Sequence, residues 1–332
     1  MEFKALIVSE NHNGIFRRTI EKRTVHELPL GELCIQVLYS SLNYKDALSA
    51  TGNKGITRHY PHTPGIDAAG IVTESASSGF SKGDQVIVTG YDLGMNTPGG
   101  FGQYIRVPAK WAIHKPEAFS LLDCMTIGTA GLTAAIALHK MELLGMIPQR
   151  GPIVVTGASG GVGSFSTALL AKKGFDVTAV TGKKEAKSFL LDLGAQKVES
   201  REFTNDHSGK PLLKSRWAGA IDTVGGNTLA TLLKGCSNEG VIVCTGMVES
   251  PHLQTTVFPF ILNGISLVGV GSAETPVELK QILWNKLAAT NKITEVLEKL
   301  RTIVSLDELN ERFIPLILEG KITGRIVIDL QK

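Results

Sequence analysis

Four glycines follow a short apolar run near the middle of the chain. The segment from Val154 to Ser164 reads Val-Val-Thr-Gly-Ala-Ser-Gly-Gly-Val-Gly-Ser. Glycine permits a tight turn and lets a ligand approach the backbone, and the N–H groups of a following helix point toward an anion. A strand, a glycine turn and a helix in this order bind the pyrophosphate of a dinucleotide. The residues predicted to line this site are Gly157, Ser159, Gly160, Gly161, Val162 and Gly163.

The elements around the glycines favour this interpretation over a plain strand-turn-helix packing motif. The spacing is G-x-x-G-G-x-G rather than the commoner G-x-G-x-x-G, so the glycines alone are weak evidence. A strand is predicted at 153–156, a helical pattern covers 165–173, and a second buried strand follows at 176–181. A β-α-β unit of about thirty residues is what a dinucleotide fold requires.

The end of the second strand indicates which dinucleotide binds. An NAD site usually places Asp or Glu about twenty residues past the glycines, where it accepts hydrogen bonds from the ribose 2'-hydroxyl. This strand instead ends in Thr181-Gly182-Lys183-Lys184. Ammonium groups, a hydroxyl and an exposed amide suit a 2'-phosphate. We predict NADPH over NADH, with Thr181, Gly182 and Lys183 as contacts; a solvated helix start is the alternative and leaves the preference undecided.

Composition excludes several classes of protein. The 332 residues suffice for two domains, and 34 basic against 31 acidic residues give a net charge of +3, too balanced for a protein that binds nucleic acid through its phosphates. No basic leader or uninterrupted apolar run of membrane-spanning length is visible, so no membrane partner is expected. Four widely spaced cysteines indicate a reducing cytoplasm, and eight histidines without ligand spacing indicate no metal site.

Two kinds of element pattern divide the chain. The first 120 residues read as short strands with one helix at 44–50, entered through Asn43; the strands are expected at 4–9, 32–39, 68–74, 85–89 and 103–107. Strands then alternate with helices, which predicts a doubly wound parallel sheet; these strands are expected at 153–156, 176–180, 219–223, 240–245 and 266–270. The tail reads as a helix at 276–289, a strand at 296–300, a helix at 306–318 and a strand at 324–330 that returns to the first domain.

Several motifs resemble the medium-chain dehydrogenase/reductase superfamily in order and spacing. Besides the glycine turn they are Ser-Leu-Asn-Tyr-Lys-Asp at 41–46, Pro-Gly-Ile-Asp-Ala-Ala-Gly at 64–70, Lys-Gly-Asp-Gln-Val at 82–86 and Ile-Gly-Thr-Ala-Gly-Leu-Thr-Ala at 127–134. Ala-Ile-Asp-Thr-Val-Gly-Gly at 220–226 and Pro-Phe-Ile-Leu at 259–262 are similar to the acryloyl-CoA reductase and quinone oxidoreductase branch. The resemblance implies an α/β fold with a Rossmann NADPH-binding domain at 128–272, a GroES-like, mainly-β catalytic domain at 1–127 and 273–332, and a homodimer.

The zinc-dependent alcohol dehydrogenases share this architecture, but their ligands are absent from this sequence. Alignment of the motifs puts Asn43, Ile66 and Thr129 where that family has its zinc-binding side chains. An amide, an alkyl chain and a hydroxyl do not hold Zn²⁺. Without a Lewis acid, oxidation of a simple alcohol is not the expected main reaction.

The reduction of a conjugated acceptor does not require a Lewis acid. A hydride can add to the β-carbon of an enone, an enoyl thioester or a quinone, and hydrogen-bond donors stabilise the charge that collects on the carbonyl oxygen. The Asn43 amide and the Tyr44 hydroxyl are the candidate donors, although the branch also suggests Tyr44 as a nicotinamide or ribose contact. Asp46 and Asp67 either hold this loop or act in catalysis. Tyr60 occupies a spacing where some enoyl reductases keep an acid, which this branch does not require.

Further cofactor contacts are expected at strand ends and from the resemblance. Met247 and Ser272 follow two of the predicted strands, and the resemblance adds Arg201 at the 2'-phosphate, Ile261 or Leu262 at the nicotinamide, and Arg325 from the other domain. Each also fits a core or surface role. The favoured function is NADPH-dependent reduction of acryloyl-CoA to propionyl-CoA. An NADPH:quinone oxidoreductase is the alternative, and a non-catalytic NADPH-binding sensor or structural protein is an alternative of another class.

Overall fold

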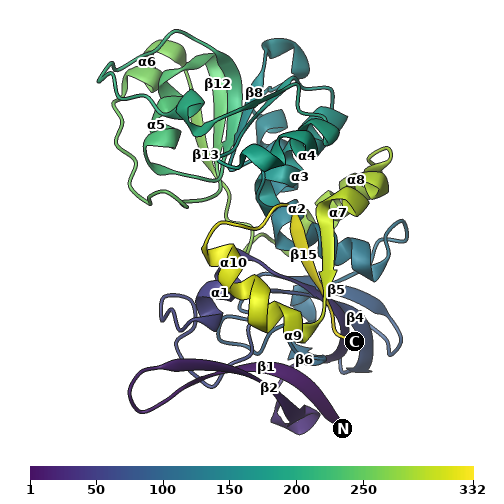
Figure 1. Ribbon diagram of the computed structural model, residues 1–332. Helices are drawn as coiled ribbons and strands as arrows, with labels where there is room; N and C mark the ends of the chain where they lie inside the picture. The colour runs from purple at the N-terminus through teal and green to yellow at the C-terminus, as the bar shows by residue number, and fades with distance from the viewer. The chain divides into compact units, whose positions relative to one another are not determined.

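Ala130–Gly271 form the first of two units in the computed structural model, which describes residues 1–332. We call this the parallel-sheet unit. Met1–Thr129 and Ser272–Lys332 together form the second, the mixed-sheet unit. The boundaries expected from the sequence are 127/128 and 272/273, and those of the structure lie at 129/130 and 271/272. The chain thus leaves the mixed-sheet unit once and returns to it once (Figure 1).

The parallel-sheet unit contains six strands in the order β10-β9-β8-β11-β12-β13, and every pair is parallel. In chain order they are β8 (Ile153–Thr156), β9 (Val177–Val180), β10 (Lys197–Glu199), β11 (Trp217–Asp222), β12 (Cys236–Cys244) and β13 (Ser266–Gly269). Counted from β8, this is the doubly wound order 3-2-1-4-5-6. The predicted α/β class and Rossmann sheet are confirmed. The order reverses between β8 and β11, and ligands bind outside the carboxyl ends of the strands at such a point.

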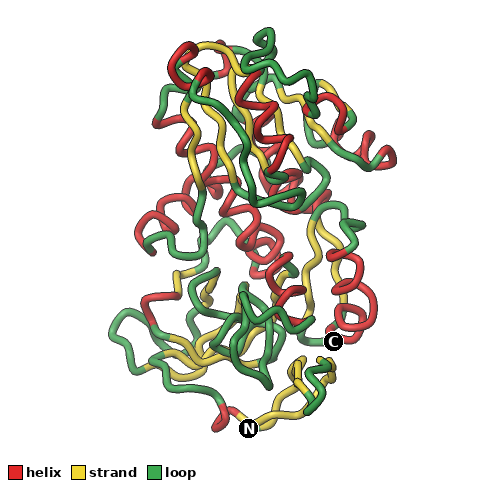
Figure 2. Tube along the Cα trace, turned by 90° about the vertical axis from the view of Figure 1, so that its left-hand side faces the viewer, coloured by secondary structure: helices red, strands yellow, loops and turns green.

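Helices cover this sheet, whose central strands are mostly apolar and buried along their whole length. All residues of β8, β9 and β11 are buried, as expected of parallel strands covered on both faces. Figure 2 shows these strands running between helices. The helices are α3 (Gly161–Lys172), α4 (Lys187–Asp192), α5 (Gly226–Lys234) and α6 (Phe258–Asn263).

The mixed-sheet unit contains a seven-stranded sheet and a separate hairpin. The sheet order is β14-β15-β3-β4-β5-β7, and β6 also pairs with β3. The hairpin joins β1 (Glu2–Glu10) to β2 (Phe16–Thr24). The sheet strands are β3 (Leu33–Ser41), β4 (Asp67–Ser75), β5 (Gln85–Thr89), β6 (Tyr104–Val107), β7 (Ala112–His114), β14 (Arg301–Val304) and β15 (Arg325–Asp329). The core of this unit includes Leu6, Val37, Phe101 and Ile328, so both ends of the chain contribute to it.

The tail returns to the first part of the chain as predicted. β15 pairs antiparallel with β3, with Val327 opposite Ser41. The helices of this unit are α1 (Tyr44–Ala50), which matches the prediction, α7 (Val277–Ala288), α8 (Ile293–Leu300), α9 (Leu306–Glu308) and α10 (Ile314–Leu318), with a π-helical turn at Leu309–Phe313 between the last two. Short 3-10 helices occur at Val25–Glu27, Ala109–Trp111, Pro148–Arg150, Lys184–Ala186 and Arg201–Thr204.

One strand prediction in the tail is wrong. Residues 296–300 belong to α8, and the strand β14 begins only at Arg301. Ile293, Val296, Leu297 and Leu300 are the buried residues of α8. Their spacing of i, i+3, i+4 and i+7 is helical, so this apolar run faces one side of a helix.

The helix α2 (Leu121–Leu143) links the two units and bends at Gly128. Gly128 has φ +47° and ψ −157°, which no helical residue adopts. By length and composition alone α2 could cross a membrane, yet 83% of its most apolar window is buried within the protein. A buried core helix passes the same test, so α2 is weak evidence for a membrane span.

Candidate functional site

The glycine turn after β8 has no room for side chains. Gly157 has φ +56°, and a Cβ on it would lie 2.2 Å from Thr223 Oγ1. A Cβ on Gly163 would lie 2.3 Å from the Gly157 carbonyl oxygen. Gly160 caps the start of α3, whose first N–H groups lack partners within the helix. The predicted turn therefore forms a bare backbone surface at a helix N-terminus, which fits a pyrophosphate.

A buried network ties this turn to the neighbouring strand. Thr156 Oγ1 donates to Asp222 Oδ1 at 2.5 Å and accepts from Thr223 N at 3.1 Å. Asp222 also accepts from Gly225 N at 2.8 Å. Burial raises the pKa of Asp222 to about 6. The carboxyl ends of β8 and β11 are thereby held together at the point where the strand order reverses.

The predicted 2'-phosphate contacts gather at the end of β9. Ser159 Oγ lies 2.9 Å from Thr181 Oγ1, which accepts from Lys183 N at 3.2 Å. A Cβ on Gly182 would lie 2.4 Å from Arg201 Nε, so the guanidinium packs against the Gly182 backbone. Burial lowers the pKa of Lys183, and the charge of Arg201 lowers it further. Arg201 therefore packs against the exposed Gly182, and Lys183, the next residue along the chain, lies close enough to feel its charge.

The apolar cofactor candidates of this unit lie on its surface. Met247, Ile261 and Leu262 are 67%, 73% and 58% exposed. Met247 follows Gly246, whose Cβ would lie 2.3 Å from the Thr223 carbonyl oxygen. Ser272 is half-buried at the start of the second stretch of the mixed-sheet unit. Cofactor contact by these four residues stays a prediction.

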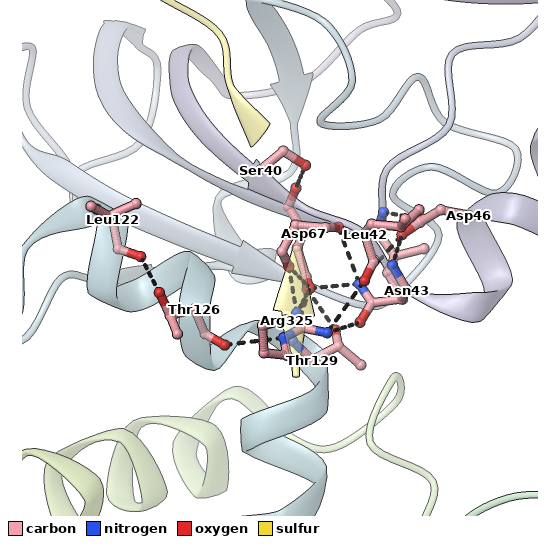
Figure 3. Close-up of polar contacts among 11 residues, drawn as sticks. Ser40, Leu42, Asn43, Asp46, Asp67, Leu122, Thr126, Thr129 and Arg325 are labelled. Atoms are coloured by element: carbon pink, nitrogen blue, oxygen red, sulfur yellow. Dashed lines mark hydrogen bonds and ion pairs between the residues drawn. The ribbon is translucent and has the colours of Figure 1, made fainter. Parts of the chain in front are cut away.

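A buried carboxylate organises the predicted catalytic loop of the mixed-sheet unit (Figure 3). Asp67 is 0% exposed at the start of β4. It accepts hydrogen bonds from Ser41 Oγ at 2.6 Å, from Asn43 Nδ2 at 2.7 Å and from Thr129 Oγ1 at 2.6 Å. Arg325 Nη2 lies 3.8 Å from its Oδ2. Four segments that are distant in sequence thus meet at this carboxylate: the start of β4, the loop before α1, the kink of α2 and the start of β15.

Arg325 lies inside this network, contrary to the expectation that it reaches the cofactor. Its side chain is 3% exposed. It donates to the carbonyl oxygens of Thr126 at 3.1 Å and Leu42 at 3.3 Å, and to Asn43 Oδ1 at 3.2 Å. It also donates to Ser41 Oγ at 2.8 Å. Burial lowers its pKa. Because its donors are engaged by protein atoms, we no longer place Arg325 among the cofactor contacts.

Asp46 is a second buried carboxylate in the same loop. It accepts from Asn43 N at 2.7 Å and from Ile66 N at 2.8 Å. Burial and the nearby charge of Asp67 raise the pKa of Asp46 to about 7. Asp46 closes the first turn of α1 and joins it to the segment that enters β4, which is a structural role.

Of the two predicted hydrogen-bond donors, Asn43 and Tyr44, only one is available to a ligand. The Asn43 amide nitrogen already donates to Asp67, and more weakly to the Ser41 carbonyl oxygen at 3.3 Å, while its oxygen accepts from Arg325. Tyr44 is 46% exposed, and its hydroxyl makes no hydrogen bond within the chain. Tyr44 is therefore the donor that remains available to a ligand. Tyr60 is engaged, since its hydroxyl donates to the Ser49 carbonyl oxygen at 2.8 Å.

The residues at the aligned zinc positions do not fit a zinc ion. Ile66 is buried and has no donor atom, and Asn43 and Thr129 are bonded to Asp67. A Cβ on Gly128 would lie 2.6 Å from Asp67 Oδ2 and 2.8 Å from Arg325 Nη2. The backbone of α2 at its kink therefore packs directly against the Asp67 network. No group of three or more His, Cys, Asp and Glu side chains is placed to hold a metal.

Sequence reasoning missed one buried cation beside this loop. Lys280 is 1% exposed on α7 and donates to the carbonyl oxygens of Thr89 at 2.7 Å and Ala273 at 3.1 Å. Its Nζ lies 3.5 Å from the centre of the Tyr91 ring. Burial lowers its pKa to about 8. Its spacing from the apolar Leu283, Trp284 and Leu287 puts it on the buried face of the helix, which was the available signal.

Comparison with protein families matches two parts of the chain. Residues 29–117 match the alcohol dehydrogenase GroES-like domain, and residues 161–289 match the zinc-binding dehydrogenase family. The GroES-like domain expected from the resemblance is thereby confirmed.

Several curated relatives are similar over the full length. The chain is 38% identical over 330 residues to YhfP of Bacillus subtilis, described as a candidate quinone oxidoreductase, with 99% of each chain covered. It is 36% identical over 331 residues to the acrylyl-CoA reductase AcuI of Ruegeria pomeroyi, again with 99% of each covered.

Solved structures with a bound dinucleotide are similar as well. The YhdH oxidoreductase of Salmonella enterica in complex with NADP has a TM-score of 0.95 and 38% identity, with 99% of each chain covered. Bacillus subtilis YhfP with NAD bound has the same TM-score, identity and coverage.

Proposed function

Because the chain belongs to the medium-chain dehydrogenase/reductase superfamily, in the branch of acrylyl-CoA reductases and quinone oxidoreductases, we propose that it is a zinc-independent, NADPH-dependent reductase of an activated C=C bond. Its leading reaction is the reduction of acryloyl-CoA to propionyl-CoA. The observation that carries this proposal is the pairing of an intact dinucleotide turn with a catalytic loop whose zinc positions are filled by Ile66 and the Asp67 network.

The parallel-sheet unit would hold the cofactor. The bare backbone at Gly157, Gly160 and Gly163 and the N-terminus of α3 bind the pyrophosphate, and Lys183 and Arg201 bind the 2'-phosphate. The bound cofactor supplies the hydride. Met247, Ile261 and Leu262 offer apolar surface to the nicotinamide and its acceptor, as the resemblance suggests.

Replacement of either cation tests the preference for NADPH. Lys183→Ala or Arg201→Ala removes an ionic partner of the 2'-phosphate, which weakens NADPH binding about tenfold and leaves NADH binding unchanged. Lys187→Ala is the matched control, because Lys187 is an exposed lysine on α4 outside the strand end predicted to contact the 2'-phosphate. Dissociation constants for both cofactors measure the effect. Equal weakening of NADPH and NADH would contradict the assignment.

Tyr44 would stabilise the developing enolate. Its hydroxyl is exposed and uncommitted, whereas Asn43 and Asp67 hold the loop that presents it. Loss of one such donor costs about 100-fold in kcat. We expect Tyr44→Phe to lower kcat to that extent with an unchanged Kd for NADPH. A weaker Kd with an unchanged kcat would instead make Tyr44 a cofactor contact, which is the alternative role.

A substrate panel tests the reaction itself. NADPH consumption with acryloyl-CoA should exceed consumption with 1,4-quinones, measured at 340 nm, the absorbance wavelength of reduced nicotinamide, on the order of tenfold in kcat/KM. Faster turnover of quinones would assign the protein as a quinone oxidoreductase, as the similarity to YhfP allows. Tight NADPH binding without turnover of any acceptor would favour the sensor or structural alternative.

We extend the proposal to a cytoplasmic homodimer. The strand β13 is the last of the parallel sheet, and an unpaired edge of this kind readily pairs with a second copy. All four cysteines are free thiols, which suits a reducing compartment. Light scattering on the purified protein measures the mass; a monomer at working concentration would contradict the dimer.

A further inference from the structure

A hollow of about 440 Å³ opens on the surface of the mixed-sheet unit, at the opposite end of α1 from Asn43. It lies where β2, the end of α1 and the π-helical turn at Leu309–Phe313 come together. Its lining residues are Phe16, Arg18, Ala50, Thr51, Asn310 and Glu311. π-Helical turns inside helices are rare and often mark functional positions.

Arg18 gives this hollow an oriented positive charge. Its Nε donates to Asn310 Oδ1 at 3.0 Å, and its Nη2 lies 3.5 Å from the Asn310 carbonyl oxygen. Arg18 is half-buried and forms no ion pair with a carboxylate, and burial lowers its pKa. A guanidinium that is desolvated, fixed in place and without a counter-ion is suited to receive an anion from outside the chain.

Phe16 is the aromatic residue of the lining, and its neighbours hold it in place. Its ring packs on Gly52, where a Cβ would lie 2.2 Å from the ring, and its centre is 4.8 Å from that of Tyr60. Lys54 Nζ lies 5.2 Å from the Phe16 ring centre, and it pairs with Glu10. A fixed apolar side chain beside a fixed arginine suits a nucleotide that carries phosphates.

We propose that this hollow binds the phosphate-bearing nucleotide end of coenzyme A in the thioester substrate, an inference that rests on the proposed function. Arg18 pairs with a phosphate of the nucleotide. Glu311 carries a carboxylate at the same hollow, which accepts hydrogen bonds from the adenine amine or a ribose hydroxyl. The acyl end then extends toward Tyr44.

The helix α1 runs from Tyr44, where the acyl end of the substrate would lie, to the hollow, where the nucleotide end would lie. Tyr44, Leu48 and Thr51 have the spacing i, i+4 and i+7, so they lie on one face of the helix and its C-terminal extension. Seven residues at 1.5 Å per residue separate Tyr44 from Thr51 by about 10 Å. The extended pantetheine arm of coenzyme A is longer than this, so it can span the face from the hollow to the Tyr44 hydroxyl.

Kinetics with a long and a short thioester test the proposal. For Arg18→Ala we expect KM for acryloyl-CoA to rise about tenfold, with KM for the acryloyl thioester of N-acetylcysteamine and the Kd for NADPH unchanged. Thr51→Glu, which adds a negative charge at the lining, should act in the same direction. Arg17→Ala is the matched control, because Arg17 is an exposed neighbour on the opposite face of β2.

The outcomes separate this inference from the proposed function. If the wild type reduces both thioesters and Arg18→Ala changes neither KM, or both equally, the assignment of the hollow is overturned. If the wild type reduces neither thioester, the proposed function fails, but calorimetric titration with coenzyme A still tests whether the hollow binds it. Binding that Arg18→Ala abolishes would support the assignment of the hollow, and absence of binding would overturn it. Competition by inorganic phosphate as strong as by coenzyme A would make the hollow a general anion site and overturn the assignment.

Discussion

At the scale of single residues, the predicted catalytic loop is held by a buried network of charged and polar groups. Two carboxylates, Asp46 and Asp67, share one buried guanidinium, that of Arg325. The buried negative charges therefore outnumber the positive one. The carboxylate with fewer stabilising contacts is the one that takes up a proton more readily. Asp67 has the hydroxyl, amide and guanidinium contacts, whereas Asp46 has mainly backbone N–H groups. Burial, together with the charge of Asp67, raises the pKa of Asp46 to about 7 against the opposing effect of these hydrogen bonds.

The raised pKa of Asp46 makes stability depend on pH. Between 3.8, its ordinary value, and about 7, the folded state binds the proton more tightly than the unfolded state. Its contribution to the free energy of unfolding therefore falls as pH rises through this window, by at most about 1.4 kcal/mol per pH unit, and is level above it. Asp46→Asn cannot titrate at this position. Urea unfolding of both proteins from about pH 5 to about pH 8 should show the wild type losing stability relative to the variant; parallel curves would refute this.

At the scale of elements, the glycine turn leaves no space for a side chain at Gly163 but does leave space for a methyl group at Gly160. In Gly163→Ala the new methyl group would lie 2.3 Å from the Gly157 carbonyl oxygen and 2.7 Å from the Ala158 Cα, both backbone atoms. The turn must shift, at a cost of about 1 to 3 kcal/mol, and NADPH affinity should fall about tenfold or more.

Gly160→Ala is the control for this substitution. Its Cβ would lie 3.4 Å from the nearest atom, and its φ of −79° is open to alanine. We expect a near-normal melting temperature for Gly160→Ala, because its methyl group meets no protein atom closer than ordinary contact. Thermal unfolding compares the two variants, and a similar loss of stability in both would show that the turn does not have the tight geometry described.

Elements with a strong local pattern were predictable from the sequence. The helix α1, entered through Asn43, and the strand, glycine turn and helix around Gly157 occur as predicted. The strand β2 was missed because Phe-Arg-Arg-Thr-Ile-Glu-Lys-Arg-Thr is mostly charged; only its pairing with β1 makes it a strand. The segment 296–300 taken alone resembles a short apolar strand. Its helical spacing becomes visible only when Ile293, one turn earlier, is included.

The candidate site was predictable in part for the same reason. Lys183, predicted from the strand end, and Arg201, added by the resemblance, lie near each other because a strand end and a short helix fix them; their contact with the cofactor stays a prediction. The surroundings of Arg325 could not be read from the sequence. Its partners Leu42, Asn43 and Thr126 are contributed by segments about 200 to 280 positions away, and only tertiary packing brings them together.

At the scale of the whole molecule, the chain completes its first domain with its last strand. β15 pairs with β3, and Leu330 N donates to the Leu38 carbonyl oxygen at 3.1 Å. Arg325 opens this strand and anchors it to the catalytic loop. The cation of the Asp67 network is thus supplied by the last strand of the chain, and the network is complete only when the tail has returned.

Removal of Arg325 should therefore disturb more than its own contacts. Arg325→Met leaves Asp67 buried without its positive partner, and such a loss costs about 3 to 5 kcal/mol of the free energy of unfolding. Asp67→Asn in the same protein removes the unpaired charge and should recover part of this loss, whereas independent residues would give additive losses. Urea unfolding of the two single variants and the double variant completes the cycle. Because Arg325 acts by positioning the loop, kcat should fall in Arg325→Met while the Kd for NADPH stays near that of the wild type; a selective loss of NADPH affinity would return Arg325 to the cofactor site.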